Sequence, residues 1–198
     1  MEVSQDNIKI AKFVAGSIGF EPHVYPYWDD SKEKSIDILS LVDPINKNVR
    51  FYSSIGVSDY PNKIEIKNDE VINIPIEILI SGYSKFDKIA NILSTCCFYI
   101  IKDKWSCQPN DVYKNIIDLY YPKKEMKHIM FNAPFLWEDK LVPLKLDSKQ
   151  VHFLFAIPIS DNELEYKNKN GAKALIALFQ SKNVDVFDIE RNSVEFLT

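Results

Sequence analysis

Glycine is scarce in this sequence, and the short motifs that depend on it are missing. Only five of the 198 residues are glycine. The sequence contains neither a Gly-x-x-x-x-Gly-Lys-Ser/Thr loop nor a Gly-x-Gly-x-x-Gly turn, so both common phosphate cradles are absent. It also lacks the Gly-x-Ser-x-Gly turn that carries the nucleophile of α/β-hydrolases. These absences exclude the corresponding nucleotide-binding and serine-hydrolase sites.

Cysteine and histidine occur three times each, in positions that do not indicate a metal site. No two cysteines have the Cys-x-x-Cys spacing, and three cysteines cannot all pair, which is typical of a reducing compartment. His23, His128 and His152 lie far apart, and none has ligand spacing to a cysteine or carboxylate. His152 lies in an alternating strand pattern, which favours a structural role. We therefore predict a cytoplasmic protein with no catalytic site, cofactor or metal.

Long apolar runs and a strong charge of one sign are also missing. No segment approaches the length of a membrane-spanning helix, and the N-terminus has no basic and apolar leader. The net charge is −4, from 24 basic and 28 acidic residues. This modest acidity argues against direct nucleic-acid binding, which requires a basic surface. It is compatible with a basic protein partner, and equally with an ordinary soluble surface.

Apolar and aromatic side chains are abundant. Hydrophobic residues make up 46% of the sequence and aromatic residues 13%, which is sufficient for one domain that spans residues 1–198. Tyrosine and tryptophan bury apolar area while keeping a polar tip. The aromatic excess therefore belongs either to the core or to a recognition surface.

Three segments have the periodicity of helices. Residues 6–18 and 86–102 each place apolar side chains on one face, and Ser84-x-x-Asp87 resembles a capping box at the start of the second. A third helical region begins at Ser160-x-x-Glu163. Within it, Asn170-Gly171 either separates two helices or lies in one closely packed helix.

Strand patterns lie between these helices. Residues 33–43 and 48–57 predict a hairpin that turns at Asp43-Pro44. Residues 74–82 place four isoleucines on one face, and Pro75 indicates either the start of a strand or a sheet edge. Further strands are predicted at 22–30, 128–134 and 151–159. The order of helices and strands predicts an α+β fold, a mixed and mostly antiparallel sheet packed with helices.

Several acidic residues are candidates for structural or binding roles. Glu77 is either an exposed strand residue or a buried acid that is paired with a base such as Arg191. Two acidic groups could contact a partner, although a turn and a helix N-terminus also explain them. The candidate partner-binding residues are Trp28, Asp29, Asp30, Asp161, Glu163 and Glu165.

Five motifs, in order, resemble the suppressor-of-fused domain family. IPIEILIS is similar to its Glu-hydrophobic-hydrophobic strand, and NAPFLW to its Pro-x-x-Trp segment. AIPISDNELEYKNKNGAKALIALFQ and DVFDIERNSV resemble the family's Pro-hydrophobic-Ser/Thr-Asp-x-Glu turn, its Gly before an Ala/Leu-rich helix, and its closing Asp-x-x-Arg-x-Ser. The resemblance implies structural roles for the matching positions, which include Glu77, Pro134, Trp137, Pro158, Gly171, Asp188, Arg191 and Ser193.

The resemblance implies an α/β sandwich that binds proteins and has no catalytic activity. Animal members bind transcription factors of the Hedgehog pathway, and short bacterial members are antitoxins that neutralise a toxin such as an LXG-type nuclease. We expect no room for the additional C-terminal domain of the animal proteins, which favours the bacterial role. The prediction is an antitoxin or immunity protein that binds a basic cognate toxin, without direct nucleic-acid or membrane contact. The alternatives are an adaptor that adds a peptide to the edge of strand 74–82, or an enzyme.

Overall fold

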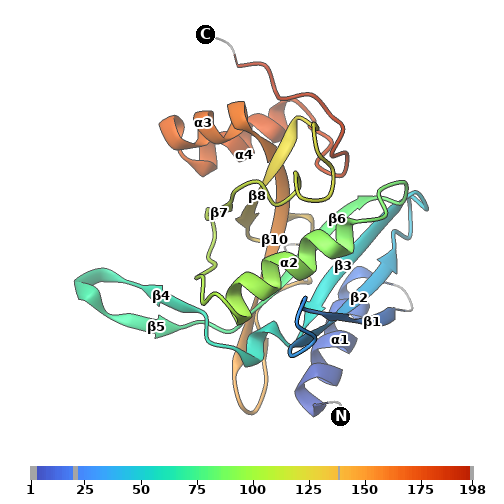
Figure 1. The fold of residues 1–198 in the computed structure, drawn as a ribbon, viewed down its shortest axis with the longest axis vertical. Coiled ribbons are helices and arrows are strands. Elements are labelled where there is room, and N and C mark those ends of the chain that lie inside the picture. The colour runs from blue at the N-terminus through green and yellow to red at the C-terminus, as the bar shows by residue number, and fades with distance from the viewer. Residues whose placement is uncertain (1–3, 20–21, 138, 197–198) are drawn as a thin grey trace.

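The computed structural model describes residues 4–19, 22–137 and 139–196. Within these ranges the chain forms an eight-stranded sheet in the order β1-β2-β3-β6-β10-β8-β7, with β9 paired to β10 (Figure 1). Strands β6 and β10 are parallel, and the other pairs are antiparallel. The strands of this sheet are β1 His23–Trp28, β2 Ser35–Val42, β3 Val49–Ile55, β6 Ile76–Tyr83, β7 Val112–Tyr113, β8 Met126–Asn132, β9 Leu144–Lys145 and β10 Gln150–Ser160.

Helices cover both faces of the sheet, which confirms the predicted α+β class. Helix α2 (Ile89–Ile101) packs on the face that carries Ile38, Ile78 and Ile80. Helix α1 (Gln5–Ile18) and helix α4 (Ala172–Ser181) pack on the opposite face. Helix α3 (Asp161–Asn170) continues directly from β10. Two hydrophobic cores therefore lie on either side of one central sheet.

Strand β6 shows why the alternation of isoleucines was informative. Ile76, Ile78 and Ile80 all lie in the core beneath α2. Pro75 immediately precedes the strand, which confirms the prediction that this proline marks a strand start. The alternative prediction, that Pro75 marks a sheet edge, is wrong, because β6 lies between β3 and β10. Strand β10 comes from a distant part of the sequence, so local patterns did not indicate this pairing.

The helix boundaries show which capping signals were reliable. Ser160 and Glu163 form the predicted capping box at the start of α3. Gly171 has a φ of 88° and separates α3 from α4, so the two-helix alternative is the correct one. The box predicted at Ser84 and Asp87 is wrong, because α2 begins only at Ile89. The Asp87 carboxylate instead accepts a hydrogen bond from the Tyr121 hydroxyl.

A two-stranded arm projects from the body of the molecule. It consists of β4 (Lys63–Glu65) and β5 (Val71–Asn73), joined through the 3₁₀ turn η2 (Lys67–Asp69). Asn68 and Asp69 in the turn both have positive φ, which these residue types tolerate. Figure 1 shows the arm extending to the left, away from the sheet.

Candidate partner-binding site

Strand β1 combines an edge position with exposed aromatic side chains. It pairs with β2 on one side and is the first strand in the sheet order. Val24, Tyr25 and Trp28 are 46%, 54% and 52% exposed. Pro26 in the same strand has no N–H to offer a further strand, which discourages nonspecific edge pairing. An edge strand rich in exposed aromatic residues has the composition of a protein-binding surface.

Asp29 occupies the turn after β1, and the structure turns its side chain inward. Only 6% of the residue is exposed. Its carboxylate accepts hydrogen bonds from the Lys102 ammonium at 2.6 Å, the Ser31 hydroxyl at 2.7 Å, and the N–H groups of Glu33 and Lys34 at 2.8 and 3.0 Å. These donors, Lys102 first, hold the pKa of Asp29 well below its usual range. The predicted partner contact at Asp29 is therefore replaced by a structural role in the turn, while Asp30 remains exposed.

This lowered pKa predicts how the turn responds to acid. Because the folded-state pKa of Asp29 lies below its unfolded value, the carboxylate stabilises the fold fully above about pH 4, and this contribution is lost as the pH falls further. Urea denaturation should show a stability difference between wild type and Asp29→Asn that is constant near neutral pH and shrinks in acid. Asp30→Asn is the matched control, since that carboxylate accepts no hydrogen bond among the described residues. A difference that stays constant down to about pH 2 would contradict the assignment.

The second predicted acidic group lies around the start of α3, and its three members differ. Asp161 is 61% exposed at its side chain and contacts Lys127 and His128. Glu165 is exposed on the same helix. Glu163 is fully buried and faces the interior. Figure 1 places α3 and β1 far apart along the long axis, so the two acidic groups do not form one surface.

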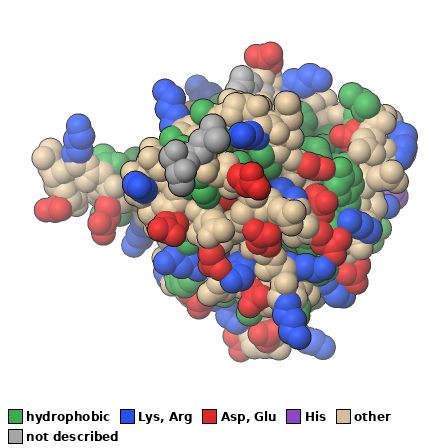
Figure 2. Space-filling model, turned by 90° about the horizontal axis from the view of Figure 1, so that it is seen from above, with side chains coloured by type: hydrophobic (Ala, Val, Ile, Leu, Met, Phe, Trp, Pro, Cys, Tyr) green, Lys and Arg blue, Asp and Glu red, His purple; other side chains and the backbone are tan. Residues whose placement is uncertain are grey.

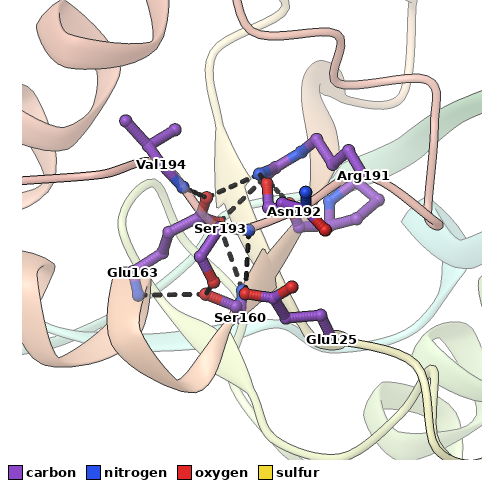
Figure 3. Close-up of polar contacts among 8 residues, drawn as sticks. Glu125, Ser160, Glu163, Arg191, Asn192, Ser193 and Val194 are labelled. Carbon is purple, nitrogen blue, oxygen red and sulfur yellow. Dashed lines mark hydrogen bonds and ion pairs between the residues drawn. The ribbon is translucent and has the colours of Figure 1, made fainter.

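Glu163 forms a buried ion pair with Arg191 (Figure 3). Two guanidinium nitrogens of Arg191 donate to its two carboxylate oxygens, at 2.5 and 2.8 Å. The carboxylate also accepts the N–H groups of Ser160 and Val194, both at 3.1 Å. A carboxylate with every oxygen engaged and no exposed surface cannot contact a partner, so the predicted binding role of Glu163 is corrected to a structural one.

The remaining motif residues surround this pair or stabilise neighbouring segments. Arg191 also donates to the carbonyl oxygen of Pro158 at 3.0 Å. The Ser193 hydroxyl donates a hydrogen bond to the Ser160 hydroxyl. Asp188 accepts the N–H of Glu190 at 2.9 Å. Pro134 precedes the 3₁₀ helix η3 (Phe135–Trp137), and Trp137 is its last residue. The Trp137 ring packs edge-on against Phe51 and Phe155.

Glu77 is buried, but its partner is not the predicted one. Arg191 is paired with Glu163, and the Glu77 carboxylate is held by hydroxyl and backbone donors. It accepts the hydroxyls of Ser54 and Ser58, at 2.5 and 2.7 Å. It also accepts the N–H groups of Gly56, Val57 and Ser58 at 2.9, 3.3 and 3.1 Å. Burial raises the pKa of Glu77, and the donors act in the opposite direction. This carboxylate fixes the 3₁₀ turn η1 (Val57–Asp59) against β6.

Other groups with chemical potential have structural partners. The Nδ1 atom of His128 accepts the N–H of Asn115 at 2.9 Å, so Nε2 carries the proton and donates to Asp161 at 3.0 Å. Burial raises the pKa values of the Cys96, Cys97 and Cys107 thiols. Over residues 4–19, 22–137 and 139–196, no cluster of three or more His, Cys, Asp or Glu side chains is placed to hold a metal ion. No helix in the same ranges is long and apolar enough to cross a membrane.

The fold and the sequence place this chain in a known protein family. The chain belongs to the suppressor of fused protein (SUFU) family, whose family model matches residues 32–192. Among its relatives is immunity protein YqcF of Bacillus subtilis (strain 168). The two sequences are 43% identical over 194 residues, which is 98% of this chain and 100% of that protein. The family predicted from the five sequence motifs is thus confirmed.

Solved structures share the fold at low sequence identity. A SUFU homologue from Neisseria gonorrhoeae FA 1090 matches with a TM-score of 0.71 and 14% identity, and 98% of each chain is covered. A chain of the Sufu-Fu complex matches with a TM-score of 0.64 and 10% identity, covering 95% of this chain and 91% of that one. Drosophila Suppressor of Fused gives 0.64 and 12%, with 95% of this chain but 51% of the Drosophila chain covered. The fold is therefore that of suppressor-of-fused proteins.

Proposed function

We propose that this protein is an immunity protein that neutralises a cognate toxin by binding it directly. The observation that carries the proposal is the 43% identity to immunity protein YqcF over the whole of that protein. Identity at this level and coverage supports an immunity role for this chain too. The protein then acts as a binding partner in the cytoplasm and has no catalytic step of its own.

The charge of the chain supports a basic toxin as partner. The net charge of −4 favours association with a basic protein through electrostatic steering. Figure 2 shows acidic and basic side chains interspersed over the face seen from above, without one large patch of either sign. A local site is therefore needed for specificity. An LXG-type nuclease is the toxin class that the family resemblance favours.

Co-expression tests this function. Cells that express the toxin from an inducible promoter should survive when this chain is produced beforehand, and the purified proteins should form a stable complex. The adaptor alternative has lost the feature that motivated it, since strand β6 has no free edge. Continued killing in the presence of abundant, soluble chain would count against the immunity role. Recovery of an unrelated peptide-bearing protein in place of a toxin would favour the adaptor.

A further inference from the structure

A hollow of about 640 Å³ opens beside the exposed Trp28 on strand β1. Its walls come from the start of α1, from β1 and β2, and from the turn after β3. The residues that matter for its chemistry are Asn7, Trp28, Asp37, Asp59 and Tyr60. Trp28 was predicted as a partner contact, whereas nothing in the sequence singled out Asp37.

The strand register explains why Trp28 and Asp37 share this hollow. Pro26 pairs with Asp37, and Trp28 pairs with Ser35. Side chains alternate between the faces of a strand, so positions 26 and 28 on β1 lie on the same face as positions 35 and 37 on β2. Directly paired and diagonal neighbours on one face are within reach of long side chains. The indole of Trp28 and the carboxylate of Asp37 therefore line one surface.

The Asp37 carboxylate has no counter-ion in the described part of the chain. It is half-buried in a strand whose neighbouring residues Ile36 and Ile38 are core residues. No hydrogen bond or ion pair from any described residue reaches it. A carboxylate without a partner in the fold adds no ion pair to its stability. It lines the hollow and remains available to a charged group from outside.

Asn7, in the wall of the hollow, also carries an acceptor that lacks a donor. The Oδ1 atom of Asn7, on the first turn of α1, is buried and accepts no hydrogen bond from the described residues. The other acid in the hollow, Asp59, is already paired with Lys149. The unbalanced charge in the hollow is thus that of Asp37. A group with several donors and a positive charge would match the Asp37 carboxylate.

We propose that this hollow receives a cationic side chain, best matched by arginine, from the protein that this chain binds. Asp37 supplies the counter-charge, and the exposed indole of Trp28 supplies a face for cation–π contact. Arginine fits best because its planar guanidinium presents five donors and stacks on aromatic rings. This inference rests on the proposed function, and it places the contact with a basic toxin at the α1 side of the β1 edge.

The test compares Asp37→Asn with wild type in binding a catalytically inactive form of the cognate toxin. We expect Asp37→Asn to bind at least about thirtyfold more weakly, mainly through faster dissociation, as for loss of a buried charge pair. Its melting temperature should stay equal or rise, because the lost carboxylate has no partner within the fold. A structural role for Asp37 would give the opposite pattern, a lower melting temperature with unchanged binding, and would overturn the proposal.

Two further variants keep the test independent of folding. Trp28→Ala should also weaken binding, and Trp28→Phe should weaken it less, since tryptophan offers the better face for a cation. Glu33→Gln is the matched control. It removes an exposed acid from the turn that joins β1 to β2, and it should change affinity by less than about threefold, through association, with an effect that disappears in high salt. An equal loss for Glu33→Gln and Asp37→Asn would reduce the effect to long-range attraction and overturn the proposal.

Mutation of the toxin identifies the cation. One arginine or lysine of the toxin should show a strong coupling to Asp37 in a double-mutant cycle, so that its replacement by alanine costs much affinity in wild type and little in Asp37→Asn. If wild type binds the toxin and Asp37→Asn binds it equally well, the hollow is not the contact and the immunity function stands. If wild type does not bind the toxin at all, the proposed function itself fails.

Discussion

Replacing Arg191 by alanine is expected to lower the free energy of unfolding by about 3 to 5 kcal/mol. The side chains of Arg191 and Glu163 are 8% and 0% exposed. Without the guanidinium, the Glu163 carboxylate keeps only its backbone and helix-capping donors in a site closed to water. A buried charge that loses its partner costs far more than the intact pair contributes. Urea denaturation, with the m-value checked for two-state behaviour, measures the loss.

Two controls separate the cost of an orphaned charge from other effects. The double variant Glu163→Gln with Arg191→Met should recover much of the lost stability, because it removes both charges together. Lys85→Ala removes the lysine of an exposed ion pair with Glu190 and should shift the unfolding midpoint little. If Arg191→Ala lowered the free energy of unfolding by less than about 1 kcal/mol, the ion pair with Glu163 would be accessible to water and the prediction would be wrong.

Replacing Glu77 by alanine is expected to cost about 4 kcal/mol. The carboxylate is fully buried and accepts five hydrogen bonds, three of them from the consecutive backbone N–H groups of Gly56, Val57 and Ser58. Hydroxyls can rotate toward other acceptors, but these backbone donors cannot, and each buried donor left unsatisfied costs about 1 to 3 kcal/mol. Chemical denaturation measures the effect, and backbone hydrogen exchange at residues 56–58 locates it.

The substitution Glu77→Gln separates shape from charge. The glutamine amide fills the same volume but turns an N–H₂ group toward donors, so its loss of stability should lie between those of wild type and Glu77→Ala. Glu65→Ala, on the exposed arm strand β4, is the control and should change stability by less than about 0.5 kcal/mol. If Glu77→Ala lost as little stability as Glu65→Ala, the assigned role of Glu77 in fixing the turn η1 would be contradicted.

Local patterns predicted the parts of the fold whose cause lies within a few residues. The alternating isoleucines of β6, the hairpin of β2 and β3, and the capping box at Ser160 and Glu163 all appear in the structure. Each depends on periodicity or on a contact three residues away. The arm was missed, although Asn68-Asp69 between Ile66 and Val71 offered a turn signal of the same kind.

Long-range partners were beyond the reach of these patterns. The sequence offered a buried acid as one of two alternatives for Glu77, but it did not indicate that Arg191 pairs with Glu163 instead. In the same way, Asp29 and Asp30 are equivalent in the sequence, and only Lys102 and the turn decide which of them is buried. Asp37 interrupts the apolar run SIDILSLV, but its position beside Trp28 follows from the pairing of β1 with β2, which no local pattern indicated.

The parallel pairing of β6 with β10 has a consequence for the speed of folding. Helix α2 and strands β7 and β8 all lie between these two strands in the chain, so the centre of the sheet closes only after a long loop has been ordered. Non-local pairing of this kind slows folding, by orders of magnitude relative to helical bundles of similar size. Newly synthesised protein should thus acquire its binding surface with a delay. Under the proposed immunity role, protection then depends on protein that was made before the toxin arrives.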